Sequence, residues 1–559
     1  MTWQTWLRRG WGIIPAALVL ALVWPERGFV PIWDGRVYFD CVVEAARSGF
    51  SVSALRCGGH HSQLTMAWLA LSQLGDPGNT THLLLANVLL AWGALWAFHA
   101  ILFALWPSEE RVVERALLTT ALAVHPLALA SLVQLNSDYG VFVFFLVCLA
   151  FFWREQRWLA AAAGLVLCFS KETGALVYAV LVAALVTERA VRVARGDLAG
   201  VVQGRSSAPA PLGAYFKSTG ALAPAFIPLA VYAAFLAWWA GTQSSYVVWN
   251  QGMHERPLAG VRWFDLDDPV FQSYAAIIFV LGFAWVPTTA IVVALGQRLI
   301  SGWRRGRMSK TAIAGAPFAS ASGHRATIAC VAVVLTYALT VYRTWSFPRY
   351  FLVLVPILLI CALISLDALK TPTRARRLLL ASYALVLFGS VRASFDPVSR
   401  LLFGTWSLGR AEVYHVSRLS RDFRVRDADH LAYNLQFTGF HHALNAAFAA
   451  LAPTESTTVV FPATNRWGLW SSLEAASYRR VGGGAGTVRP RYADEVMVAA
   501  LREQAPRELW LVQQPNDADS GALTALHRRY VDAGAAQYSA QNVTIQLLHL
   551  VRREAQVIP

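Results

Sequence analysis

Charged side chains interrupt the most apolar parts of this chain at a few short loops. Lys171 and Glu172 stand between two apolar runs in the stretch LCFSKETGAL, and Asp34 follows the first apolar run. Arg343 and Arg349 flank a short aromatic segment. A carboxylate can take a proton from an attacking hydroxyl group, and Lys and Arg bind a phosphate and stabilise the charge that it gains on leaving. These residue types therefore suit a reaction with a hydroxyl nucleophile and a phosphate leaving group.

The elements that must hold these side chains are membrane-spanning helices. The chain of 559 residues is 56% hydrophobic and only 14% charged, whereas about 25% of the residues of a soluble protein are charged. Many apolar runs approach the roughly 17–25 residues that a helix needs to cross the hydrocarbon core, and this pattern predicts helices rather than a barrel. The first run, 12–25, has no small-residue cleavage site, so we expect a retained span and not a removed signal peptide.

The location of the basic residues orients these helices. The net charge of +15 is concentrated in short loops between the apolar runs, which is typical of cytoplasmic loops and does not indicate a nucleic-acid partner. These loops, each expected to be solvated, are 109–115, 154–157, 188–217, 298–310 and 370–377. The expected spans are 12–25, 82–106, 115–133, 138–153, 158–170, 174–187, 221–240, 273–296, 326–342, 350–366 and 378–393. About 11 spans place the N-terminus in the cytoplasm and the C-terminus outside.

A second domain is expected after the last span. We predict a mainly α, polytopic transmembrane bundle over 1–393 and a soluble, extracytoplasmic α/β domain over 394–559, where no apolar run is long enough to span. Segments rich in β-branched and aromatic residues predict strands at 457–461, 508–512 and 543–548, and 440–451 predicts a helix. The glycine cluster 482–486 lacks the strand-to-helix context of a phosphate loop and is interpreted as a flexible loop.

Ionisable residues of the expected outer loops all face one membrane surface. They are Asp34, Asp40, Glu44, His60, His61, Asp138, Lys171, Glu172, Arg343 and Arg349. The middles of the spans carry almost no charge, with His125 as the main exception. Ionisable residues at the bilayer centre mark ion and substrate paths, so their scarcity argues against a proton-coupled transporter.

Four outer segments share a pattern with one enzyme group. They are Trp33-Asp-Gly-Arg-Val-Tyr38 with the following Ala-rich stretch and His60-His61, Asn136-Ser-Asp-Tyr139, Ser170-Lys-Glu-Thr-Gly174, and Pro348-Arg-Tyr350. In this order they resemble the outer loops of the GT-C glycosyltransferases that use polyprenyl-phosphate sugars, such as the protein O-mannosyltransferases and the lipid A aminoarabinose transferase. Many members have an acidic pair where this chain has Asp34-Gly35, so Asp40 and Asp138 are both candidates for a second carboxylate.

The resemblance implies an inverting glycosyltransferase of the plasma membrane. Such an enzyme moves one sugar from a polyprenyl phosphate to a glycan, lipid or protein acceptor on the extracytoplasmic face. It implies that Asp34 is the general base. The residues implied in substrate binding are Asp138, Lys171, Glu172, Arg343, Arg349, Tyr350, Asp40, His60 and His61, with the cations on the lipid phosphate and Glu172 orienting Lys171. No nucleotide site and no cofactor is implied beyond the lipid donor. A divalent cation is not indicated, but Mg²⁺ keeps few protein ligands, so an ion between Asp34, Asp138 and a phosphate stays an open alternative.

Structural roles are the alternatives for these residues. Asp34 lies near the start of one expected helix and Asp138 near the start of another, so each could instead cap its helix, Asp138 together with Asn136. Lys171 and Glu172 could instead form an ion pair at the membrane interface. Two further functions also use a charged outer face. One is a transporter or flippase that recognises the head group of a lipid-linked glycan, which the apolar span centres disfavour. The other is an assembly or receptor protein, for which about 11 spans are more than an anchor needs.

The first outer loop holds two further pairs of candidate residues. His60 and His61 have no Cys or His partner at the spacing of a zinc site, so we predict no metal centre. Cys41 and Cys57 would form a disulfide if this loop, 26–81, faces an oxidising compartment. The other four cysteines lie within expected spans, where a thiol acts as a small apolar group.

Overall fold

A computed structural model of the chain describes two compact units. The described residues are 12–29, 31, 34–50, 64–194, 222–242, 285–304, 323–342, 348–391, 413–415, 424–426, 442–444, 446–447, 449–451, 459–462, 491–493, 506–513, 524, 526–540 and 543–553. One unit consists of Met1–Pro25, Asp40–Trp406 and Val413–Leu431, and the other of Glu26–Phe39, Ser407–Glu412 and Ala432–Pro559. The predicted domain boundary between 393 and 394 lies outside the described residues.

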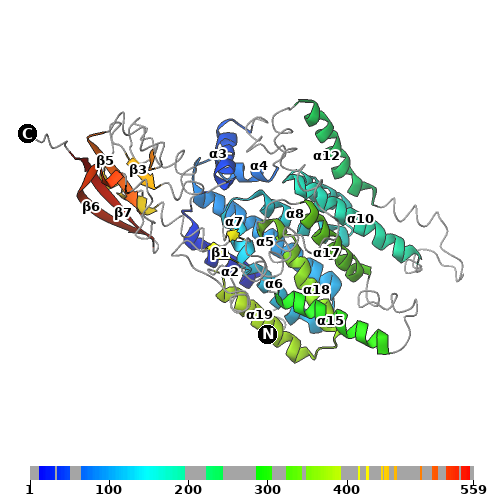
Figure 1. The fold of residues 1–559 in the computed structure, drawn as a ribbon. Helices are drawn as coiled ribbons and strands as arrows, with labels where there is room; N and C mark the ends of the chain where they lie inside the picture. The colour runs from blue at the N-terminus through cyan, green and yellow to red at the C-terminus, as the bar shows by residue number, and fades with distance from the viewer. Residues whose placement is uncertain are drawn as a thin grey trace, which may run out of the picture. The chain divides into compact units, whose positions relative to one another are not determined.

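Each predicted span coincides, wholly or in part, with a helix of the structure (Figure 1). These helices are α2 (Ile13–Val23), α5 (Thr80–Leu105), α6 (Val112–Ala123), α7 (Pro126–Val133), α8 (Ser137–Trp153), α9 (Arg157–Cys168), α10 (Glu172–Ala194), α12 (Ala223–Thr242), α15 (Trp285–Arg304), α17 (Gly323–Tyr342), α18 (Leu354–Ala368) and α19 (Thr373–Gly389). Two further helices, α3 (Asp34–Arg47) and α4 (Leu64–Leu71), lie in the stretch expected to be the first outer loop. The chain is thus mainly helical where the sequence predicts a membrane bundle.

Two of these helices, Thr80–Leu105 and Glu172–Ala190, are long and apolar enough to cross a membrane by themselves. Glu109–Ala123 and Pro126–Val133 meet this criterion together and are bent by 45°. Proline lacks an N–H group and forces the residue before it into an extended backbone, as seen at His125 (φ −68°, ψ 121°). The predicted span 115–133 thus coincides with two helices that meet at a bend, and its crossing of the membrane stays a prediction. The full number of about 11 crossings stays a prediction.

Helix α8 lies in the interior of the first unit and separates two groups of loops. It packs against α5, α9 and α10, and almost all of its side chains are buried. Its 17 residues extend over about 25 Å. The loops before α8 and α10 meet at its N-terminal end, where Lys171 pairs with Asp138. The orientation of these helices in a membrane stays a prediction.

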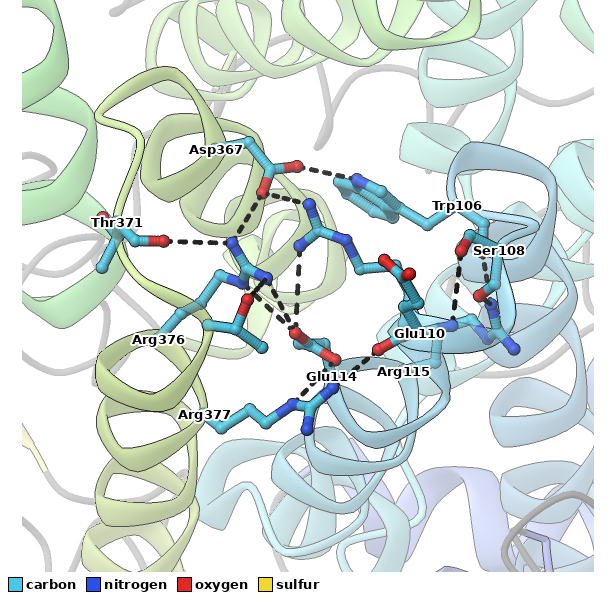
Figure 2. Close-up of polar contacts among 11 residues, drawn as sticks. Trp106, Ser108, Glu110, Glu114, Arg115, Asp367, Thr371, Arg376 and Arg377 are labelled. Atoms are coloured by element: carbon cyan, nitrogen blue, oxygen red, sulfur yellow. Dashed lines mark hydrogen bonds and ion pairs between the residues drawn. The ribbon is translucent and has the colours of Figure 1, made fainter. Parts of the chain in front are cut away.

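A network of buried ion pairs joins the start of α6, the end of α18 and the start of α19. The Glu114 carboxylate has no exposed surface. Its oxygens form ion pairs with guanidinium nitrogens of Arg376 at 2.9 Å, Arg377 at 3.4 Å and Arg111 at 3.9 Å. Arg111 also pairs with Asp367 at 2.8 Å. Figure 2 shows Arg376 between the two carboxylates, at 3.4 Å from Asp367 Oδ1. The loops 109–115 and 370–377 were expected to be solvated, and this prediction is wrong for Glu114 and Arg376.

The physical reason for this burial is mutual compensation. A buried charge is stable only when an opposite charge and hydrogen bonds replace its water. Trp106 Nε1 donates to Asp367 Oδ2 at 2.9 Å, and Arg115 donates to the backbone carbonyls of Trp106 and Ser108 (Figure 2). Short loops with both signs of charge can therefore pack inward, whereas counting basic residues alone predicts solvation.

The second unit contains a five-stranded sheet of order β4-β3-β5-β7-β6. Its strands are β3 (Val459–Pro462), β4 (Arg491–Ala493), β5 (Glu508–Gln513), β6 (Tyr530–Ala540) and β7 (Val543–Arg552). β3 pairs in parallel with β4 and β5, whereas β5, β7 and β6 pair antiparallel. Successive residues along β3 belong to different core clusters, one of them with the helix His442–Leu451. Core residues thus lie on both faces of β3, β5 and β7, which matches the apolar strands in the sequence, whereas β6 is largely exposed.

Two short strands belong to the first unit. β1 (Val413–His415) and β2 (Arg424–Arg426) form an antiparallel pair.

The predicted strands 457–461, 508–512 and 543–548 coincide in part with β3, β5 and β7. The glycine cluster 482–486 lies outside the described residues.

Candidate functional site

A buried ion pair lies at the N-terminal end of α8. Lys171 Nζ donates to Asp138 Oδ2 at 2.6 Å, and the two side chains are only 8% and 5% exposed. Arg349 Nε lies 3.8 Å from the same oxygen and its side chain is 10% exposed. Three loops that are far apart in sequence thus bring one carboxylate and two cations together. We call Asp138, Lys171 and Arg349 the outer charge cluster.

Local structure aims Asp138 into this cluster. Asn136 is the N-cap of α8, and its side chain accepts the Asp138 backbone N–H at 3.0 Å. Asp138 therefore lies in the first turn, where a carboxylate is stabilised by the helix dipole. The proposed capping role of Asp138 is thus filled by Asn136, and the Asp138 side chain has an ion-pair partner instead.

A close approach of backbone segments holds the Lys171 turn. Lys171 immediately precedes α10, and its carbonyl accepts the Gly174 N–H at 2.8 Å. A Cβ atom at Gly174 would lie 2.0 Å from the Leu167 carbonyl oxygen at the end of α9, so only glycine fits here. The glycine in the SKETG motif thereby allows the tight reversal that brings Lys171 to Asp138.

The third contribution comes from the 3₁₀ turn η5 (Pro348–Phe351), which packs against α7 and α8. The Tyr350 ring lies next to both cations. Lys171 Nζ is 4.7 Å and Arg349 Cζ is 5.4 Å from its centroid. A cation over an aromatic ring is attracted by the electrons of the ring, so Tyr350 helps to hold both cations at the site.

The electrostatics of the outer charge cluster favour an anion. Its two cations and one carboxylate leave one positive charge, and the N-termini of α8 and α10, each equivalent to about half a positive charge, lie at the same end of the bundle. Glu172, the first residue of α10, is half-buried and adds a carboxylate beside the cluster. The formal charges of the four side chains then cancel, so the net positive charge at this place comes from the two helix N-termini. A phosphate, which accepts several hydrogen bonds from Lys, Arg and helix N-termini, is the ligand best suited to this arrangement.

The remaining predicted site residues are distributed as follows. Asp34 is the first residue of α3. Asp40, on the same helix, is exposed. Arg343, His60 and His61 lie outside the described residues, so their predicted positions are not compared with the structure.

One partnership was missed by the sequence reasoning. Lys171 was expected to be held by its neighbour Glu172, whereas the structure gives it Asp138 as an ion-pair partner. Both residues were recognised as outer-face candidates, but their separation of 33 residues hides the pairing. Packing of α8 against α9 and α10 brings them together, and the sequence signal was limited to their shared membrane face.

The sequence predicts no zinc site and a disulfide between Cys41 and Cys57. Within the part of the chain that the structure describes, no group of three or more His, Cys, Asp or Glu is arranged to hold a metal ion. Cys41 is disulfide-bonded. Cys57, its predicted partner, lies outside the described residues, so the predicted pairing stays a prediction.

Comparison with known proteins gives structural relatives only. No protein-family model matches the chain, and no curated protein matches its sequence.

The solved structures that are similar to the chain include the following three. The crystal structure of ArnT from Cupriavidus metallidurans bound to undecaprenyl phosphate is 14% identical, with a TM-score of 0.45 over 96% of this chain and 98% of that one. The arabinofuranosyltransferase AftD from Mycobacteria is 15% identical, with a TM-score of 0.41 over 98% of this chain but 40% of that one. The Archaeoglobus fulgidus oligosaccharyltransferase is 10% identical, with a TM-score of 0.41 over 97% and 73%. All are GT-C membrane glycosyltransferases, the group that the sequence motifs resemble.

Proposed function

We propose that the chain is an inverting membrane glycosyltransferase that moves one sugar from a polyprenyl phosphate to an acceptor hydroxyl on the extracytoplasmic face. The observation that carries this proposal is the outer charge cluster, in which Lys171 and Arg349 share the buried Asp138 carboxylate. A buried ion pair contributes little net stability, so a bundle that needed only cohesion at this end would be served by apolar residues.

The proposed reaction is a single displacement. The acceptor hydroxyl loses its proton to the Asp34 carboxylate while its oxygen forms a bond to the anomeric carbon of the sugar. The bond from that carbon to the phosphate oxygen breaks on the opposite side, which inverts the configuration. Lys171, Arg349 and Arg343 bind the polyprenyl phosphate and stabilise the negative charge that develops on it. Asp138 is already engaged with two cations, so we assign the proton to Asp34.

A cellular experiment identifies the donor. The gene is inactivated in its host, and the lipid-linked sugars of the membrane are extracted and measured by mass spectrometry. We expect one polyprenyl-phosphate sugar to accumulate, because the step that consumes it is lost, and the wild-type gene to restore its normal level. An unchanged set of lipid-linked sugars would refute the proposed donor class.

A variant of Asp34 tests the proposed base. Asp34→Asn keeps the shape of the side chain but cannot accept the proton, and general-base catalysis contributes about 10²–10⁴-fold to a rate. We expect the rate of sugar transfer to fall by about 10²-fold or more, while the protein still inserts into the membrane. Glu44→Gln is the matched control, because it removes an exposed carboxylate from the same helix α3. Near-normal transfer by Asp34→Asn would remove Asp34 from the mechanism.

A further inference from the structure

The helix α4, which has no part in the proposed chemistry, packs on the turn that carries Lys171. The backbone N–H of Leu64 donates to the Phe169 carbonyl at 2.8 Å, and Thr65 Oγ1 lies 2.7 Å from Ser170 Oγ. Both hydroxyl-bearing residues are buried, with 3% and 1% of their surface exposed. Two contacts on successive residues therefore fix the position of this turn relative to α4.

The direction of the hydroxyl hydrogen bond follows from the second bond of Ser170. Ser170 Oγ donates its one proton to the Val166 carbonyl at 2.7 Å. A hydroxyl has one proton and two acceptor positions, so Thr65 must be the donor to Ser170. Substitution of Thr65 by valine would leave the Ser170 oxygen with an unfilled acceptor position, whereas serine would preserve the bond.

The same threonine also contacts the helix that carries Asp138. A Cβ atom at Gly140 of α8 would lie 2.4 Å from Thr65 Oγ1 and 2.9 Å from its methyl carbon. Gly140 is thus the residue type that lets Thr65 lie against α8, two positions after Asp138. Ser170 stands one position before Lys171. Thr65 is therefore in contact with both segments that supply the ion pair.

We propose that Thr65 is a positioning residue that sets the separation of Lys171 and Asp138, and thereby the place at which the Lys171 ammonium receives the lipid phosphate. This inference rests on the proposed function. Thr65 touches neither the substrate nor the reacting atoms in this account; it acts through Ser170 on one side and Gly140 on the other.

Hydrogen exchange of the purified full-length protein tests the positioning without any activity measurement. In Thr65→Val, amides of the peptides that contain residues 164–176 should exchange about tenfold faster, because amide exchange follows local opening. Thr65→Ser should exchange as the wild type does. Thr119→Val is the matched control, since Thr119 is buried and donates to the Arg115 carbonyl at 2.8 Å at a place far along the bundle. Unchanged exchange at 164–176 in Thr65→Val would overturn the inference.

Kinetics then connect the positioning to the donor. A misplacement of about 1 Å can cost on the order of 10²-fold in rate, so Thr65→Val should lower kcat/KM for the lipid donor by about 10–100-fold and leave the acceptor KM unchanged. Thr65→Ser should restore it to within a few-fold. A merely structural role would instead reduce the amount of folded protein and leave these constants of the remaining enzyme at the wild-type values.

A second variant covers the case in which Thr65→Val does not fold. Ser170→Ala removes the acceptor of the same hydrogen bond and should give the same exchange and kinetic changes, and the double variant should be no worse than either single one, because coupled partners are not additive. Independent, additive effects would overturn the inference. If the wild-type protein transfers no sugar from any polyprenyl phosphate, the proposed function fails, whereas the exchange experiment still decides whether Thr65 positions the turn.

Discussion

Neutralising Glu114 should destabilise the bundle more than any change at an exposed ion pair. Its carboxylate has no exposed surface and faces Arg376, Arg377 and Arg111 at 2.9, 3.4 and 3.9 Å. In Glu114→Gln the volume is conserved, so no cavity forms, but Arg377 loses its ion pair with Glu114, and Arg111 and Arg376 then share the one carboxylate of Asp367 (Figure 2). Removing one partner of a buried pair costs about 3–5 kcal/mol, and we expect a loss of about 3 kcal/mol because the glutamine oxygen can still accept from Arg376.

The assay is the free energy of unfolding of the purified protein in mixed detergent micelles, with the thermal midpoint as a second readout. Glu155→Gln is the control: Glu155 is 60% exposed and also pairs with an arginine, Arg189, at 3.0 Å. Exposed pairs contribute about 0–1 kcal/mol, so this variant should stay close to the wild type.

The cause can be separated from a general loss of packing by a second substitution. If the uncompensated charge is responsible, Glu114→Gln combined with Arg376→Met should be more stable than the sum of the two single losses predicts, because the pair is removed together. A loss below about 1 kcal/mol in Glu114→Gln, or strictly additive losses in the double variant, would refute this account of the network.

Two further predictions concern a charge and a close approach. Lys171→Met should weaken binding of a polyprenyl phosphate by about 10–100-fold, since a charged hydrogen bond contributes about 1.5–3 kcal/mol. Binding of radiolabelled lipid measures this loss. Lys370 is an exposed lysine, so the control variant Lys370→Met should bind the lipid as the wild type does. Gly164→Ala should lower the free energy of unfolding by about 1–3 kcal/mol, because its Cβ would lie 2.4 Å from the Tyr178 ring. Gly93→Ala, with no atom within 4 Å, should be neutral or stabilising by up to about 1 kcal/mol. Equal effects of the two lysine variants, or of the two glycine variants, would contradict the respective structural reasoning.

The helices were predictable because membrane helices need long apolar runs, and the loops because their charges stand out between these runs. The break at Pro126 was overlooked, although the proline itself is a signal for it. The hydropathy of 115–133 is continuous, and its average conceals one residue without an N–H group.

The site was predictable only as a set of candidates. Asp138, Lys171 and Arg349 could be assigned to one face, because each lies where a span begins, but their pairing depends on how α8, α10 and η5 pack. Thr65 carries no charge and gave no signal in the sequence. The burial of Glu114 was hidden for a related reason: its partner Arg376 lies 262 residues away along the chain.

The most direct test of the central claim is the formation of polyprenyl phosphate from the lipid-linked sugar that accumulates when the gene is inactivated. The purified protein is given this lipid extract together with membranes that contain the acceptor, and polyprenyl phosphate is quantified by mass spectrometry. We predict that the wild type releases polyprenyl phosphate as the sugar leaves the lipid fraction, and that Asp34→Asn does not. Sugar-lipid that is moved across the membrane but stays intact, or equal release by Asp34→Asn and the wild type, would contradict the account.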